Sequence, residues 1–295
     1  MKINHKLKTQ SEKSTEHGLH MPRAMSVKWL SFPYLIWMAG FIIIPLIMIV
    51  YYGLISKEGT FTLNNIALIA DPVNRKALFL ALELSIISTI ICLILAYPLA
   101  LILNNSNMKS NSFIVLIIIL PMWMNFLLRT IAWQNILEKT GVLNNILTFL
   151  HLPTLNIINT PSAIILGMVY NFLPFMVLPI YNVLIKIDKD VVNAARDLGA
   201  SNSQTFRKII FPLTLPGVVS GITMVFVPSL TTFVISTILG GSKILLIGNV
   251  IEQQFSKVNN WHAGSGLSLV LMIFVLISMA VLSKYDKGNE GGNLW

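Results

Sequence analysis

The residues of this sequence that could carry chemistry are few, and most of them lie inside long apolar stretches. Glu83, Asn125, Arg129 and Asn171 are charged or amide residues within segments composed mainly of Ile, Leu, Val and Phe. A charge at the centre of a lipid-embedded helix costs about 2.5–3.5 kcal/mol on insertion scales, so such a group usually has a partner or a function. The chemistry these residues offer is recognition of a polar solute.

Two interpretations of these residues remain open. Glu83 could contact a cation in a translocation path, or it could be a carboxylate near the membrane surface bonded to a neighbouring helix. Asn125 and Arg129 are four residues apart and share a helix face, which could line a path or bond to a loop. Asn171 could line a kinked helix or hydrogen-bond between helices.

Aromatic rings in the same stretches offer a second kind of contact. Trp123 and Tyr170 could present their ring faces to an ammonium group through cation–π attraction. Aromatic side chains in membrane helices also serve packing and interfacial anchoring, so cation–π binding is the less favoured interpretation of these two residues.

The motifs of the common catalytic sites are missing from the sequence. It contains no Gly-Lys dipeptide and hence no phosphate-binding loop of the form G-x-x-x-x-G-K-[ST]. The five histidines show no metal-ligand spacing, and the one cysteine, Cys92, lies in an apolar run. We therefore expect neither a metal site nor an enzyme, and ATP, if it is used, must bind to another chain.

One polar segment, residues 188–217, stands between two apolar runs and is the most charged internal part of the chain. Asp188 can cap a short helix that ends near Leu198, and Gly199 suits the turn that follows. Ser201 and Gln204 have the spacing of a capping box, which predicts a second helix. Pro212 lacks an N–H group and is expected to end it.

Composition determines the class of protein that must position these residues. The chain has 295 residues, of which 55% are hydrophobic and 11% charged, and its mean hydropathy is +0.73. Soluble domains carry roughly 25% charged residues, so a bilayer suits this chain better than water. The net charge of +9 is not gathered on one basic face, and we expect no nucleic-acid partner.

Six apolar runs predict an all-α membrane protein with six transmembrane helices. Each run reaches the roughly 20 residues that are needed to cross about 30 Å of hydrocarbon. The predicted spans are residues 29–56, 77–103, 112–133, 161–185, 215–239 and 265–284. A small surface helix is expected near residues 141–151, and residues 240–264 are expected to form a loop.

Lysine and arginine predict how the spans are oriented. With the N-terminus in the cytoplasm, the inner segments hold 14 of these residues and the outer segments 7. This bias places both termini and residues 188–217 in the cytoplasm. The predicted organisation is a cytoplasmic tail over residues 1–28, a six-helix domain over 29–285 and a cytoplasmic tail over 286–295.

The polar segment resembles the EAA motif of ABC importer permeases. That motif has EAA, three residues, Gly, nine residues and I-x-L-P, and the spacing is the same here. Asn193 and Phe211 replace the usual Glu and Leu. The resemblance implies a coupling element that docks on the ATPase. The residues it implicates are Asn193, Ala194, Ala195, Asp197, Gly199, Ala200, Ile209 and Pro212.

Three further segments resemble the spermidine/putrescine importer permeases. They are LPMWMNFLLRTIAW at 120–133, TPSAIILGMVYNFLPFMVLPIY at 160–181 and LGGSKILLIGNVI at 239–251. This sequence departs from the pattern of those permeases in its long basic tail and at Glu83, where a neutral polar residue is expected. Because such a cargo is cationic, a structural role is the favoured interpretation of Arg129.

This resemblance implies a MetI-like type I importer fold in the cytoplasmic membrane. Its implied partners are cytoplasmic ATPase subunits that bind ATP and Mg²⁺, a second related permease, and a periplasmic or extracellular polyamine-binding protein. It also implies polyamine import by alternating access. Three alternatives remain open. The first is the same architecture with another cargo, such as thiamine, iron or an oxyanion. The second is a carrier or channel that needs no ATPase, and the third is an intramembrane enzyme.

Overall fold

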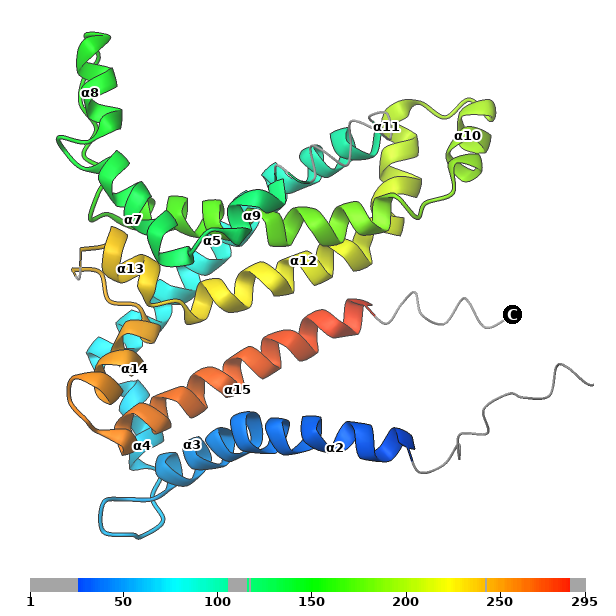
Figure 1. Cartoon of the computed structure of the whole chain (residues 1–295). Helices are drawn as coiled ribbons and strands as arrows, with labels where there is room; N and C mark the ends of the chain where they lie inside the picture. The colour runs from blue at the N-terminus through cyan, green and yellow to red at the C-terminus, as the bar shows by residue number, and fades with distance from the viewer. Residues whose placement is uncertain (1–25, 106–115, 117, 242, 287–295) are drawn as a thin grey trace, which may run out of the picture. The chain divides into compact units, whose positions relative to one another are not determined.

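The computed structural model describes residues 26–105, 116, 118–241 and 243–286, and every regular element in that part of the chain is a helix (Figure 1). The predicted all-α class is therefore confirmed. An isolated antiparallel bridge joins Ile55 and Phe61 across a loop. Five helices of the described part are long and apolar enough to cross a bilayer: Phe32–Leu54, Pro72–Asn104, Pro161–Leu184, Asn202–Thr231 and Trp261–Lys284.

The chain divides into two units, residues 1–51 and 52–295. The first unit contains α2 (Ser26–Met38), the π turn η1 (Ala39–Ile43) and most of α3 (Ile44–Leu54). Its helix therefore begins inside the predicted tail of residues 1–28, and residues 1–25 lie outside the described part. The side chains of this helix are mostly large and apolar, and residues 32–54 are long enough to cross a bilayer.

The second unit contains the other helices of the described part of the chain. Their order is α4 (Asn64–Ala67), η2 (Leu68–Ala70), α5 (Pro72–Asn105), η3 (Leu120–Trp123), α7 (Phe126–Leu137), α8 (Val142–Phe149), α9 (Pro161–Leu184), α10 (Lys189–Asp197), α11 (Asn202–Thr205), η4 (Phe206–Ile210), α12 (Phe211–Thr231), α13 (Val234–Leu239), α14 (Ile247–Ser256) and α15 (Trp261–Asp286). The small helix expected at residues 141–151 is α8, and the fourth predicted span is α9.

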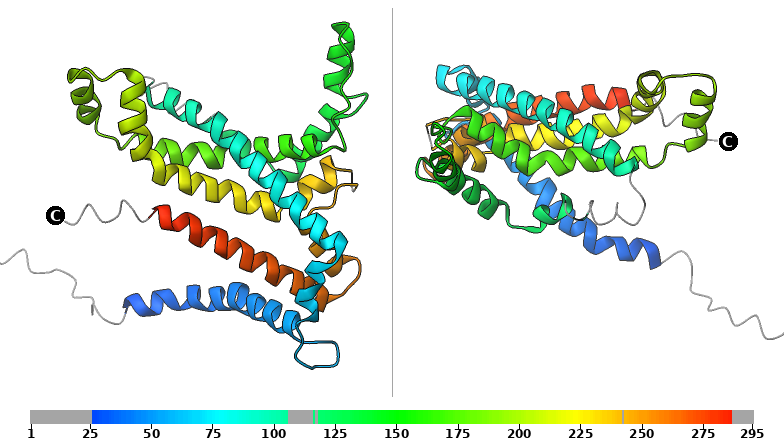
Figure 2. Two further views of the ribbon diagram at one scale, coloured as in Figure 1. Left: turned by 180° about the vertical axis from the view of Figure 1, so that it is seen from behind. Right: turned by 90° about the horizontal axis from the view of Figure 1, so that it is seen from above.

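The core of the second unit is formed by α5, α9 and α12, which pack against one another. Both views of Figure 2 show these three helices side by side. Glycine lets α12 approach α9 closely: a Cβ atom on Gly217 would lie 2.8 Å from the Pro179 carbonyl oxygen. A Cβ atom on Gly221 would lie 2.7 Å from the Met176 sulfur. Small residues at such contacts are typical of membrane helices, which associate by close packing.

The prediction that Pro212 ends the second helix of the polar segment is wrong. The helix continues from Asn202 to Thr231, through a π turn at η4. The Phe211 N–H donates to the Phe206 carbonyl, an i→i−5 bond. Pro212 directly follows this π turn, at the second position of α12, and the helix runs on past it.

The predicted boundaries of the fifth and sixth spans are also corrected. Thr232 has extended backbone angles (φ −66°, ψ 138°), so the fifth span ends at Thr231 and residues 234–239 form the separate helix α13. The expected loop at residues 240–264 contains α14. The sixth helix begins at Trp261 and reaches Asp286, the last described residue.

The second and third predicted spans differ from the structure at their ends. The second helix, α5, begins at Pro72, five residues before the predicted start. Residues 112–115 and 117 of the third lie outside the described part. The rest of that span is interrupted, because Met124 is extended (φ −76°, ψ 147°) between η3 and α7.

Gly217→Ala is expected to lower stability by about 1–3 kcal/mol, because the new methyl group meets backbone atoms of α9 that cannot move aside. The measurement is thermal unfolding of the detergent-solubilised protein. Gly40→Ala is the control, since a Cβ atom at Gly40 has nothing within 4 Å. Equal melting temperatures for the two variants would contradict the close α9–α12 contact.

Candidate functional sites

The first helix of the polar segment, α10, has the cap that the sequence predicts. Asp188 Oδ1 accepts a hydrogen bond from the Asp190 N–H at 2.9 Å. Asp190 lies in the first turn and Arg196 in the last. Each charge is opposite in sign to the partial charge of its helix end and therefore stabilises the helix. These local interactions hold a nine-residue helix that has no buried residue of its own.

The hydrogen bonds between residues 195 and 200 are those of a Schellman turn. The Ala200 N–H donates to the Ala195 carbonyl at 3.0 Å, and the Gly199 N–H donates to the Arg196 carbonyl at 2.9 Å. Gly199 has φ +83°, where a side chain would be strained. The turn reverses the chain at the tip of the segment.

The capping box that begins the second helix is confirmed. The Ser201 N–H donates to Gln204 Oε1 at 2.9 Å, and the Gln204 N–H donates to Ser201 Oγ at 3.3 Å. The helix continues into α12, so its backbone joins this end directly to the membrane-spanning part.

An aromatic cluster that the sequence analysis missed fastens this helix to α5. The rings of Tyr97, Phe206 and Phe211 have centroids 5.6–6.2 Å apart. The Tyr97 hydroxyl lies 2.6 Å from Thr214 Oγ1. Tyr97 is more than a hundred positions from the other members along the chain, so no local pattern could have revealed the contact. We call this group of four residues the aromatic joint.

The outer surface of the segment is open for contact. Leu198 exposes 89% of its surface at the tip of this otherwise polar hairpin, which Figure 1 shows projecting beyond the long helices of the second unit. A large apolar side chain in that position favours contact with another protein. Of the residues that the motif implicates, five are exposed and three half-buried: the exposed ones are Asn193, Ala194, Asp197, Gly199 and Pro212, and the half-buried ones are Ala195, Ala200 and Ile209.

The structure does not bring the predicted path residues into one site. Glu83 is exposed on α5, and Trp123 exposes 81% of its surface beside the break before α7. Asn125 is the cap of α7, where its Oδ1 accepts from the Leu127 N–H at 2.8 Å. Asn125 thus has a local structural role.

Tyr170 and Asn171 face different surroundings on α9. The Tyr170 ring meets Trp133 edge-on at 5.2 Å and lines a mainly apolar cavity of about 540 Å³. Asn171 is 1% exposed, and its Nδ2 donates to the Gly167 carbonyl at 2.9 Å. Its Oδ1 has no hydrogen-bond partner among the described residues.

Arg129 is buried on α7, with 8% of its surface exposed. Its Nε and Nη1 atoms have no hydrogen-bond partner in the part of the chain that the structure describes. A bond from Arg129 to a neighbouring loop, as the structural interpretation expects, is therefore not among the described contacts.

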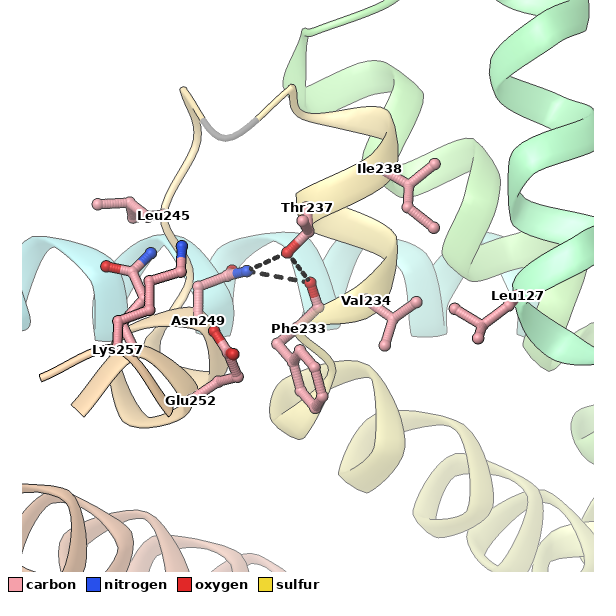
Figure 3. Close-up of a pocket in the computed structure, with 10 residues that line it drawn as sticks. Leu127, Phe233, Val234, Thr237, Ile238, Leu245, Asn249, Glu252 and Lys257 are labelled. Atoms are coloured by element: carbon pink, nitrogen blue, oxygen red, sulfur yellow. Dashed lines mark hydrogen bonds between the residues drawn. The ribbon is translucent and has the colours of Figure 1, made fainter. Parts of the chain in front are cut away.

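A second pocket, drawn in Figure 3, is lined by residues that follow the C-terminal end of α12 and by neighbouring helices. Its volume is about 310 Å³, near the lower limit of small-molecule sites. It is lined by residues of α7, α13 and α14 and of the segments beside them: Leu127, Phe233, Val234, Thr237, Ile238, Leu245, Asn249, Glu252, Gln253 and Lys257. The pocket lies just past the C-terminal end of α12, whose 21 residues span about 31 Å, the thickness of a bilayer core.

Asn249 holds this pocket together, and only 3% of its surface is exposed. Its Nδ2 donates to the Phe233 carbonyl at 3.0 Å and to Thr237 Oγ1 at 2.8 Å, the bonds drawn in Figure 3. Its Oδ1 accepts from the Leu246 N–H at 3.0 Å and from Ser236 Oγ. One amide therefore ties α13 to the start of α14.

These features together define a class of protein. A polytopic helical membrane protein with an exposed polar hairpin between two of its spans has the architecture that a transport subunit of the ABC importer type requires. The family model described as "Binding-protein-dependent transport system inner membrane component" matches residues 96–285, and the chain belongs to this family of inner-membrane permeases.

Relatives within the family are similar over most of the chain. The spermidine/putrescine transport system permease protein PotB of Escherichia coli (strain K12) is 38% identical over 253 residues, which cover 83% of this chain and 92% of that protein. The protein of the same name from Haemophilus influenzae is 33% identical over 259 residues, covering 85% and 91%.

A solved structure supports the fold. A chain of a bacterial alginate ABC transporter, crystallised in complex with an alginate pentasaccharide-bound periplasmic protein, superposes with a TM-score of 0.73. It is 15% identical and covers 87% of this chain and 92% of its own. The predicted importer-permease fold is thereby confirmed.

Asn249→Ala is expected to speed amide hydrogen exchange at Leu246 by about tenfold or more, because the N–H loses its acceptor and the tie between α13 and α14 is lost. The control is Asn182→Ala on the exposed surface of α9, which should leave exchange unchanged. Unchanged exchange in the Asn249 variant would contradict the role of this amide in holding the pocket.

Proposed function

We propose that this chain is the permease subunit of an ATP-driven importer that moves the polyamines spermidine or putrescine across the cytoplasmic membrane. The observation that carries the proposal is the 38% identity over 253 residues with a spermidine/putrescine permease. Similarity of that extent reaches far beyond the polar segment of residues 188–217. We call it the coupling segment from here on, and by itself it indicates the class of transporter and not its cargo.

The proposed partners are those that an importer of this type requires. Cytoplasmic ATPase subunits bind ATP and Mg²⁺, since the sequence has no phosphate-binding loop of its own. A second, related permease completes the path, and a binding protein outside the membrane delivers the polyamine. The orientation that suits this arrangement has both termini in the cytoplasm, in agreement with the bias of lysine and arginine.

The proposed mechanism is alternating access driven through the coupling segment. ATP binding closes the ATPase dimer, and α10, with Leu198 at its end, moves with the surface on which it docks. The continuous helix from Asn202 to Thr231 and the aromatic joint transmit that displacement to the membrane core. The spans then change from inward-facing to outward-facing, a two-state change that ATP binding biases.

Gly199→Asp is expected to reduce ATP-driven spermidine uptake at least tenfold while the protein still inserts and assembles. The substitution strains a turn with φ +83° and adds a charge to the docking surface. The measurement is uptake of labelled spermidine into proteoliposomes that contain the complete transporter, with ATP hydrolysis recorded in parallel.

Gly59→Asp is the matched control. Gly59 has φ +81° and, like Gly199, nothing within 4 Å of the place that a Cβ atom would take, but it lies in the loop between the first two spans. Its variant should retain uptake. Normal uptake by the Gly199 variant, or an equal loss in both variants, would argue against coupling through this segment.

A further inference from the structure

We propose that the Asn249 pocket binds one primary ammonium group together with its methylene chain, and so forms a polyamine site within the permease itself. The inference rests on the proposed function and adds to it a site, its residues and its strength. The pocket supplies three kinds of contact that such a ligand needs, namely a carboxylate, an aromatic ring and an apolar wall.

The carboxylate is that of Glu252. Its Oε1 accepts one hydrogen bond, from Ser256 Oγ, whereas an ionised carboxylate can accept about four. The remaining capacity is available to the N–H groups of an ammonium ion. Figure 3 shows the Glu252 carboxylate on the side of Asn249 that faces Phe233.

The ring and the wall suit the rest of the ligand. Phe233 exposes 42% of its surface and lines the pocket together with Glu252, so an ammonium group bound there can also meet the face of the ring. A polymethylene chain gains free energy by leaving water for an apolar wall, and a small inorganic cation does not. The wall is made of Leu127, Val234, Ile238 and Leu245.

Lys257 sets the strength of the site. Its side chain also lines the pocket, and in Figure 3 it lies on the opposite side of Asn249 from Phe233. The pocket therefore holds one negative and one positive side chain, and it accepts one ammonium group while repelling a second. Binding is weak as a result, which a transport path requires because the solute must leave again.

The place of the pocket fits a transfer step. It lies about 31 Å along α12 from the start of that helix at Phe211, at the outer end of the membrane in the proposed orientation. Asn249 holds its floor rigid, so the contacts are in place before the ligand arrives. A polyamine released by the binding protein would meet this site before it enters the membrane.

The test measures binding of tritiated spermidine to the complete detergent-solubilised transporter without its binding protein. Glu252→Gln should raise the dissociation constant at least tenfold, because the amide cannot neutralise an ammonium ion. Lys257→Gln should lower it about threefold or more, because the repulsive charge is removed. Glu58→Gln, an exposed carboxylate outside the pocket, should leave it within twofold of the unsubstituted protein.

The two pocket variants are expected to change the dissociation constant in opposite directions, which separates a binding site from a structural effect. Unchanged binding in both pocket variants, or weaker binding in both, would overturn the inference. If Glu252→Gln fails to assemble, Lys257→Gln decides alone. Uptake is measured after the same transporter is reconstituted into proteoliposomes with its binding protein and ATP. An unsubstituted transporter that takes up no spermidine there refutes the proposed function, whereas normal uptake with unaltered binding in the variants refutes only the pocket site.

Discussion

The continuous helix between Asn202 and Thr231 is the constraint on which the rest of this structure depends. A single helix joins the coupling segment to the membrane core and ends beside the Asn249 pocket. The π turn at η4 preserves that continuity past Pro212. Gly217 lies in close contact with α9, and the aromatic joint holds the same helix to α5. The helix therefore cannot move without these two neighbours. A displacement at one end is therefore felt by the core at the other.

Much of the fold can be predicted because its signals are local. Hydrophobic length locates five spans, and Asp188, Ser201 and Gly199 mark caps and a turn through bonds within a few residues. The errors arise where a non-local or uncommon interaction decides the outcome. The prediction that a helix ends at Pro212 is wrong because it assumes i→i−4 hydrogen bonds along the whole helix. The helix α14 is missed because its amphipathic sequence is short and lies among polar and glycine residues.

The two functional regions differ in how far the sequence can define them. The proposed coupling residues lie within one short stretch, residues 193–212, so their geometry follows from local turns and caps. The predicted path residues are scattered along α5, α7 and α9, and the structure leaves Glu83 exposed while Asn125 caps a helix. The pocket depends instead on contacts between α7, α13 and α14 that no periodic pattern encodes. A carboxylate in an expected loop, Glu252, is the only sign of it in the sequence.

The most direct test of the central claim is the accessibility of a thiol at the tip of the coupling segment. Cys92, the one native cysteine, is buried, so Leu198→Cys supplies a single exposed thiol. In intact cells it should resist a membrane-impermeant maleimide, and in inside-out vesicles it should react and crosslink to the ATPase subunit, with a yield that changes on ATP binding. Labelling from the outside of intact cells would contradict the account.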